Sequence, residues 1–309
     1  MSALGGPAVA LVGATASGKS ALAHRLAVEL GEVDIVSVDA MCVYRGMDLA
    51  TAKPTVAERA EVPYHLVDLV EPSEEFTVAQ FQREARTATA TIFRQGRRAL
   101  FVGGTGLYGR AVLDDLEIPG RYPEVRAGLD ERAASDLDGL YAELEALDPI
   151  AATRLERTND RRVVRALEVT LGSGRAFSSY GEGLMAYGPV RVVQVGLDVE
   201  LEVLDERIDA RFHRWLEEGL LEEVRALLER PGGLGRTARQ AVGYRELLAH
   251  LEGGVPLEDC VRDALTQSRR LARRQRSWFR RDPRVEWFHD PDAAARRLVE
   301  VLSGGDRSV

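Results

Sequence analysis

Lysine is almost absent from this chain of 309 residues, because Lys19 and Lys53 are the only two and arginine supplies nearly all of the positive charge. Cysteine is equally scarce, and Cys42 and Cys260 are too few for a disulfide framework. No apolar run reaches the length of a membrane span. Nothing before Gly13 combines a basic segment with a cleavage site. We therefore expect a protein of the reducing cytoplasm.

An excess of positive charge is also missing, since the formal net charge is −8. An acidic surface repels a phosphate backbone, which argues against indiscriminate nucleic-acid binding but leaves room for a local basic face. The length is sufficient for one α/β domain with an insert or a second small domain.

The most informative stretch follows the apolar run 8–12 and reads GATASGKS. It fits G-x-x-x-x-G-K-[ST] between a predicted strand and a predicted helix, although a Gly/Ser-rich turn can also match by chance. Backbone N–H groups of such a loop bind phosphate together with the helix N-terminus. Lys19 would place its charge on the terminal phosphates, and Ser20 would ligate Mg²⁺. The predicted diphosphate-binding residues are Gly13, Ala14, Thr15, Ala16, Ser17, Gly18, Lys19 and Ser20.

Two further predicted strands end in residues suited to chemistry. The strand 34–38 delivers Asp39, and the strand 99–102 leads into a Gly-rich turn that contains Thr105. The carboxyl ends of parallel strands lie at the edge of the sheet where the phosphate loop lies. Asp39 is therefore a candidate general base or outer-shell magnesium partner, unless it only caps the next turn. Thr105 is a candidate hydrogen-bonding group at the reacting centre, unless the turn is only structural. The strand 99–102 ends in Gly-Gly and not in the aspartate of a motor ATPase's second phosphate motif, which disfavours a hydrolase.

The pattern predicts a P-loop NTPase-like α/β fold, in which a parallel sheet is flanked by helices and carries a helical insert. Residues 124–172 are almost wholly helical in pattern, and their leucines are spaced for a buried stripe. We expect a discontinuous core of residues 1–113 and 190–300, a helical subdomain of residues 114–189 and a disordered tail of residues 301–309. The stripe consists of Leu137, Leu140, Leu144 and Leu147.

Arginines crowd one predicted helix at 268–281, where no acidic residue interrupts them. This stretch is the predicted basic face, with Trp278 and Phe279 packed into the core. A strand at 190–197 and a helix from Ile208 to near Gly219 are expected before it. The arginines are Arg269, Arg270, Arg273, Arg274, Arg276, Arg280 and Arg281.

The segment DAMCVYRGMDLATAKP at 39–54 resembles the tRNA dimethylallyltransferase family. Departures from the family pattern are Ala14, Ala40, Cys42 and Ala50, whereas Arg273 keeps the charge of a lysine. Together the matching blocks cover roughly residues 9–281. The further blocks are PYHLVD at 63–68, FTVAQF at 76–81, GGTGLY at 103–108, DP at 148–149, NDRRVVRALEV at 159–169, VGYREL at 242–247 and RRQRSWFR at 273–280.

The resemblance implies transfer of a dimethylallyl group from dimethylallyl diphosphate to the N6 amine of adenosine 37, beside the tRNA anticodon. Mg²⁺ would assist, and Lys19, Asp39, Thr105 and Arg211 would be catalytic. Diphosphate departs from an allylic carbon, the weakly nucleophilic amine captures that carbon, and Asp39 accepts the proton. The adenine would be flipped into a channel between Asp39 and Thr105. Arg211 would approach the diphosphate, or it pairs instead with Asp205 or Asp209.

The same resemblance assigns the insert to clasping the anticodon stem-loop, although salt bridges on a solvated helix face would equally account for its arginines. The implied tRNA-binding residues are Asp39, Ala40, Met41, Cys42, Thr105, Arg126, Arg161, Arg162, Arg165, Gln240, Gly243, Tyr244, Arg245 and Arg274.

Three other functions remain open at this point. A small-molecule P-loop kinase would share the loop and an aspartate after the second strand, but needs neither the insert nor the arginine-rich helix. A free-nucleotide (adenylate) prenyltransferase would share the chemistry and should lack the insert. A non-enzymatic RNA-binding module would not need Asp39. We expect the chain to act as a monomer away from membranes.

Overall fold

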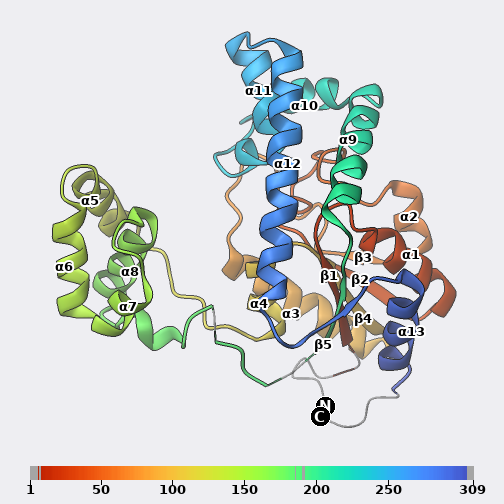
Figure 1. Cartoon of the computed structure of the whole chain (residues 1–309), viewed down its shortest axis with the longest axis horizontal. Helices are drawn as coiled ribbons and strands as arrows, with labels where there is room; N and C mark the ends of the chain where they lie inside the picture. The colour runs from red at the N-terminus through yellow and green to blue at the C-terminus, as the bar shows by residue number, and fades with distance from the viewer. Residues whose placement is uncertain (1–5, 7, 185, 190–191, 305–309) are drawn as a thin grey trace. The chain divides into compact units, whose positions relative to one another are not determined.

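The chain folds into two compact units in the computed structural model, which describes residues 6, 8–184, 186–189 and 192–304 (Figure 1). The core unit comprises Met1–Asp114 and Pro189–Val309, and the helical unit comprises Asp115–Gly188. These bounds differ by one residue at each end from the insert 114–189 that the sequence suggests.

The core unit is built on a six-stranded sheet with the order β3-β2-β4-β1-β5-β6. Every neighbouring pair is parallel. The predicted fold class is therefore confirmed. Residues 190 and 191 of the strand expected at 190–197 lie outside the described residues. The strands are β1 (Ala8–Gly13), β2 (Val33–Val38), β3 (Tyr64–His65), β4 (Arg98–Gly103), β5 (Val193–Leu197) and β6 (Val285–Phe288).

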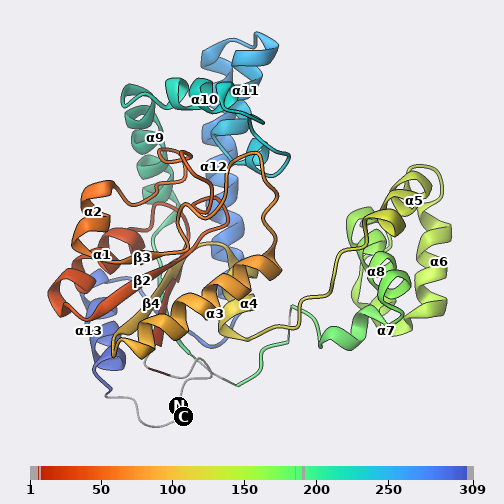
Figure 2. The same ribbon diagram turned by 180° about the vertical axis from the view of Figure 1, so that it is seen from behind.

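Helices cover both faces of this sheet, as Figures 1 and 2 show from opposite sides. The helices of the core unit are α1 (Lys19–Leu30), α2 (Val56–Glu61), α3 (Val78–Arg94), α4 (Gly106–Leu113), α9 (Leu201–Glu217), α10 (Leu220–Glu229), α11 (Tyr244–Gly253), α12 (Leu257–Arg280) and α13 (Pro291–Leu302), with the short 3₁₀ helix η2 (Ala238–Gln240).

Successive side chains of the central strand enter two different hydrophobic clusters, because strand side chains alternate between the faces of a sheet. Val9 and Leu11 pack in a cluster with residues of α1 and α13. Ala10 and Val12 pack in a second cluster, with residues of α3, α4, α10 and α11. With both faces covered, the interior of the sheet is buried throughout, which is typical of parallel sheets.

The structure corrects several expected element boundaries. Helix α1 ends at Gly31, whose φ of 70° suits glycine, as predicted. Helices α9 and α12 begin earlier than expected, at Leu201 and Leu257. The tail prediction is wrong at its start, because α13 runs to Leu302, which is buried. Residues 305–309 lie outside the described part of the chain.

The helical unit has its own small core, formed by residues of α5, α6, α7 and α8. Leu140 and Leu144 are completely buried, as expected, whereas Leu147 is 46% exposed. The prediction that Leu147 belongs to the buried stripe is wrong, because α6 ends at this residue and the chain turns at Asp148, which caps α7. The elements are α5 (Pro123–Ala133), α6 (Leu137–Leu147), α7 (Pro149–Arg154), α8 (Asp160–Ser173) and the 3₁₀ helix η1 (Phe177–Tyr180).

The described residues agree with the sequence on the cysteines and on the lack of a long apolar run. Both cysteines are buried free thiols. No described helix is both long and apolar enough to cross a membrane.

Candidate active site

The phosphate loop joins β1 to α1 at the carboxyl edge of the sheet, as predicted. Gly18 has a φ of 91°, and Gly13 has a φ of 153°, so both glycines stand where L side chains are strained. A Cβ on Gly13 would also lie 3.1 Å from the Leu197 carbonyl oxygen. The Oγ of Ser17 is buried without a hydrogen-bond partner. The loop thus keeps an unused hydroxyl beside the helix N-terminus, where an anion binds favourably.

Lys19 lies in this loop with its ammonium 3.0 Å from the Ala14 carbonyl oxygen, to which it donates a hydrogen bond. Burial, with the positive charge of Arg211 beside it, lowers the pKa of Lys19 to about 8, although Asp39 opposes the shift. A bound anion would stabilise the charged form of this ammonium. Ser20 is exposed and borders a cavity that is also lined by the phosphate loop.

This pKa predicts how binding of a diphosphate depends on pH. Binding favours the charged lysine, so affinity should change little below pH 8 on account of Lys19. Above about pH 8, the free protein loses this proton, and the dissociation constant should rise by up to about tenfold per pH unit. Titration calorimetry with inorganic diphosphate from pH 7 to pH 10 measures this. A flat profile over that range would contradict the shifted pKa.

A second cation reaches the loop from α9. Arg211 donates from Nη2 to the Thr15 hydroxyl at 2.7 Å, and its guanidinium lies 4.7 Å from the centre of the Trp215 ring. Burial, and after it the charge of Arg214, lower the pKa of Arg211 to about 10, so the group is charged at neutral pH. Its Nε–H is buried without a partner. A donor in this position is available to an anion in the loop.

The alternative partners suggested for Arg211 are occupied by other arginines. Arg269 pairs with Asp209, and Arg273 pairs with Asp205 at 2.7 Å. Arg211 also lies in the middle of α9 and not at a helix start, because the helix begins at Leu201. The acidic side of α9 therefore binds α12, while Arg211 borders the cavity.

Sequence reasoning missed two residues that hold the loop. The Gln275 side-chain oxygen of α12 accepts a hydrogen bond from the Thr15 N–H at 2.7 Å. Arg207 of α9 donates to the Ala16 carbonyl oxygen at 3.3 Å. A lone glutamine among arginines was the available sequence signal for Gln275. Because both contacts join segments far apart in the chain, periodicity alone does not reveal them.

Asp39 follows β2 and borders the same cavity. Its Oδ1 accepts hydrogen bonds from the N–H groups of Met41 at 2.7 Å and Cys42 at 3.3 Å. The turn-capping interpretation is thus confirmed for one oxygen. No described protein group donates to Oδ2, which leaves that oxygen available as a proton acceptor.

Thr105 lies beside this turn, at the end of β4. Its Oγ1 accepts a hydrogen bond from the Ala40 N–H at 3.3 Å. Gly103 and Gly104 border the cavity, whereas Thr105, predicted at the reacting centre, is not among the described residues that line it. The Thr105 hydroxyl therefore stabilises the turn that holds Asp39, whether or not it also contacts the substrate.

The cavity has a volume of about 830 Å³ and lies within the core unit. Volumes of roughly 300–1,000 Å³ are typical of ligand sites. It places the phosphate loop, Arg211 and Asp39 around one space. Its lining includes Thr15, Ser17, Lys19, Ser20, Asp39, Met41, Cys42, Ala50, Thr51, Lys53, Gly104, Arg207, Arg211, Trp215, Val242 and Gln275.

Several residues assigned to RNA lie elsewhere than expected. Tyr244 is completely buried with its hydroxyl donating to Glu223, so its side chain belongs to the core and not to an RNA-accessible surface. Gly243 is buried as well, with Ala50 packed against it. Gln240 and Arg245 are exposed. Ala40 and Met41 are partly exposed, whereas Cys42 is buried, and this burial raises the pKa of its thiol.

The predicted basic face on α12 is narrower than the sequence suggests. Four of its seven arginines form ion pairs with aspartates of other elements, namely Arg269, Arg273, Arg276 and Arg280. Arg270, Arg274 and Arg281 are exposed and make no ion pair with a described residue. Phe279 is buried and Trp278 packs against the core, as predicted.

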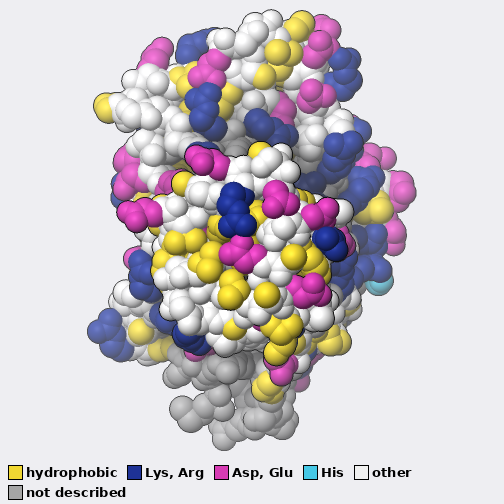
Figure 3. Space-filling view, turned by 90° about the vertical axis from the view of Figure 1, so that its left-hand side faces the viewer, with side chains coloured by type: hydrophobic (Ala, Val, Ile, Leu, Met, Phe, Trp, Pro, Cys, Tyr) yellow, Lys and Arg dark blue, Asp and Glu magenta, His cyan; other side chains and the backbone are white. Residues whose placement is uncertain are grey.

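The arginines of the helical unit also divide into two groups. Arg126 and Arg165 both pair with the buried carboxylate of Glu168, at 3.6 Å and 2.9 Å. Salt bridges within the helical unit therefore account for Arg126 and Arg165. Arg161 and Arg162 are exposed and form no ion pair within the described chain. Basic and acidic side chains are intermingled on the face that Figure 3 shows.

Comparisons with known proteins agree on one family. The family model for IPP transferase matches residues 42–282. A tRNA dimethylallyltransferase of Kineococcus radiotolerans is 47% identical over 308 residues, which cover 96% of each chain. One from Pseudarthrobacter chlorophenolicus is 44% identical over 293 residues, 94% of this chain and 96% of that protein.

Solved structures give the same result. A full-length tRNA isopentenylpyrophosphate transferase from Bacillus halodurans is 36% identical with a TM-score of 0.69, covering 96% of each chain. A eukaryotic dimethylallyltransferase, described as acting on tRNA, has a TM-score of 0.78 and 26% identity, over 96% of this chain and 80% of that one.

Proposed function

The chain belongs to the IPP transferase family, and on that premise we propose that it transfers a dimethylallyl group from dimethylallyl diphosphate to the N6 amine of adenosine 37 of tRNA, releasing diphosphate. The observation that supports this best is one cavity bordered by a phosphate loop, a partly buried arginine and a carboxylate. The loop and arginine suit a diphosphate leaving group, and the carboxylate suits the amine.

The reaction exchanges one bond for another. The bond between the allylic carbon and the diphosphate oxygen breaks, and the adenine nitrogen bonds to that carbon. The nitrogen then loses a proton, which passes to Oδ2 of Asp39. The amine becomes acidic only as its new bond forms, and a carboxylate can then accept its proton.

Stabilisation of the departing diphosphate falls to the loop and to two cations. Lys19 places a compact charge on the terminal phosphate, while Arg211 donates its unpaired Nε–H. Preorganised donors of this kind are most effective where charge develops in the transition state.

A Mg²⁺ ion fits the oxygen donors of this cavity. The Ser20 hydroxyl borders this space and would bind the ion directly, with Asp39 reaching it only through water; phosphate and water complete the hard oxygen ligands that Mg²⁺ prefers. The described residues contain no group of three acidic, histidine or cysteine side chains that would hold a metal by themselves. When bound, the ion would supply positive charge to the leaving diphosphate.

The acceptor adenine must leave its stack to reach this cavity, since a stacked base is enclosed by its neighbours. We place it beside Asp39 and the turn that contains Thr105. Arg161, Arg162 and Arg274 are the exposed, unpaired candidates for holding the anticodon stem-loop. The chain would act in the cytoplasm as a monomer.

A labelled-substrate assay tests the function. Tritiated dimethylallyl diphosphate and Mg²⁺ are offered with an anticodon stem-loop RNA, AMP and ATP in parallel. We expect label in the RNA alone. Label in AMP or ATP would instead indicate free-nucleotide prenylation, and consumption of ATP with small hydroxylated metabolites, without any label transfer, would indicate a kinase.

The exposed arginines of α12 give a separate prediction for RNA binding. Arg274→Ala should weaken binding of the stem-loop and reduce the slope of log K against log salt by about 1, because one phosphate contact is lost. Fluorescence anisotropy at several salt concentrations measures both. Arg262→Ala is the control, because Arg262 is exposed on the same helix but already pairs with Asp259. Equal slopes for both variants would remove Arg274 from the RNA surface.

A further inference from the structure

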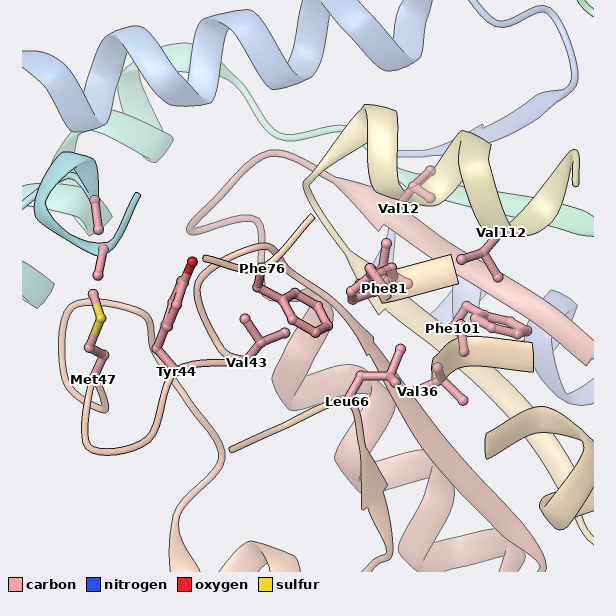
Figure 4. Packing of buried hydrophobic residues seen from close by; sticks show 14 of the residues in the cluster. Val12, Val36, Val43, Tyr44, Met47, Leu66, Phe76, Phe81, Phe101 and Val112 are labelled. Carbon is pink, nitrogen blue, oxygen red and sulfur yellow. The ribbon is translucent and has the colours of Figure 1, made fainter. Parts of the chain in front are cut away.

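The loop at residues 39–54 carries much of the cavity wall without any helix or strand of its own. It begins with Asp39 and ends at Pro54, the residue after the second of the two lysines. Its middle is anchored in the main core, where Figure 4 shows Val43, Tyr44 and Met47 in one cluster with strand residues. Backbone hydrogen bonds pair Cys42, Val43 and Arg45 with residues 68–70, and side-chain contacts add to them in positioning the loop.

The ammonium of Lys53 supplies three of these side-chain contacts from inside the loop. Its side chain is 1% exposed. It donates three hydrogen bonds, to the Tyr44 carbonyl oxygen at 2.7 Å, to Asp48 at 2.6 Å and to Asp68 at 2.7 Å. Because an ammonium has three N–H groups, all of its donors are used within the protein. Lys53 borders the cavity, but it has no donor left for a phosphate.

A chain of hydrogen bonds connects Lys53 with Asp39. Lys53 binds the Tyr44 carbonyl oxygen at 2.7 Å. The Tyr44 N–H donates to the Met41 carbonyl oxygen at 3.2 Å. The Met41 N–H donates to Oδ1 of Asp39 at 2.7 Å. The ammonium thus holds the turn that fixes one carboxylate oxygen of Asp39 and leaves the other available.

Two carboxylates make this buried charge tolerable. Asp48 and Asp68 each accept from Lys53, and Arg59 pairs with the other oxygen of Asp68 at 2.5 Å. A buried charge is costly unless it is paired and hydrogen-bonded. An arginine offers a planar fork instead of three donors around one nitrogen, and would not reproduce these three bonds.

We propose that Lys53 is a positioning residue for the transfer reaction, which holds the cavity-lining loop so that Asp39 presents Oδ2 to the acceptor amine. It touches neither substrate. The proposal rests on the proposed function in taking Asp39 as the proton acceptor. Its effect should appear in the rate of the chemical step and not in the binding of diphosphate, which depends on the phosphate loop.

The test compares Lys53→Met with Arg59→Met. Both changes remove a cation from Asp68, but only Lys53 contacts the loop. We expect kcat to fall about tenfold to a hundredfold in Lys53→Met, since small misplacements of catalytic groups cost this much. The dissociation constant for inorganic diphosphate, measured by calorimetry, should stay within about twofold of the parent chain. Arg59→Met should keep the parent kcat.

Other outcomes would overturn the proposal. These are an unchanged kcat in Lys53→Met, an equal loss in Arg59→Met, or a parallel loss of diphosphate binding in a folded Lys53→Met. If Lys53→Met does not fold, Lys53→Arg is decisive: it keeps the charge, and a kcat equal to that of the parent would refute the need for three donors. Failure of the parent chain to label RNA would instead refute the proposed function, so the two failures are distinguishable.

Discussion

An Asp39→Asn variant is expected to transfer the prenyl group roughly 10²–10⁴-fold more slowly than the parent chain, the usual loss when a general base is removed. The amide oxygen can still accept the hydrogen bonds from Met41 and Cys42 that Oδ1 accepts now. The turn should therefore persist, while the atom that takes the proton is replaced by an amide nitrogen. Single-turnover transfer to an anticodon stem-loop measures the effect directly.

Two further measurements separate the role of Asp39 as a base from its role as a cap. RNA affinity and diphosphate affinity should stay close to those of the parent chain, which also distinguishes an enzyme from a simple RNA-binding module. Asp136→Asn is the matched control, because Asp136 caps α6 with one oxygen only, Oδ1, which accepts from the Gly139 N–H, and because it does not border the cavity. A transfer rate in Asp39→Asn equal to that of the control would mean that Asp39 is not the base.

Much of the core unit could be predicted because its signals are local. An apolar strand, a glycine-rich loop and a helix ending at Gly31 follow one another directly in the sequence. The rule that parallel strands end at a common edge then places Asp39 near the phosphate loop. These steps need only sequence neighbours and one topological rule, and the structure agrees with them.

Contacts between distant segments could not be predicted in the same way. The arginines of α12 look like one basic face because no acidic residue interrupts the sequence 268–281. Asp209 and Asp205, which neutralise Arg269 and Arg273, precede them by 60 and 68 residues. Tyr244 is implied to bind RNA by the family resemblance, but its side chain is buried and its hydroxyl donates to Glu223 of a different helix. The sequence marks Lys53 only as one of two lysines, and its three acceptors follow from the fold.

Arg211→Met is expected to lower kcat/KM for dimethylallyl diphosphate by about 10²–10³-fold, as for the loss of one preorganised donor to a developing anion. The variant loses the Thr15 contact and the unpaired Nε–H together. Most of the loss should appear in kcat, because the charge on the leaving oxygen grows as the carbon–oxygen bond breaks. Steady-state kinetics with the stem-loop held saturating measure both parameters.

Arg211→Lys shows whether charge alone is sufficient. A lysine keeps one positive charge, but it lacks both the planar contact with Trp215 and the separate Nε and Nη donors that the guanidinium supplies. We therefore expect it to recover less than half of the lost activation free energy. Arg225→Met is the control, because Arg225 is exposed on α10, close to Glu222, and does not border the cavity. Full recovery by lysine would reduce the role of Arg211 to a diffuse positive charge, and an unaffected Arg211→Met would assign the diphosphate to Lys19 and the loop without it.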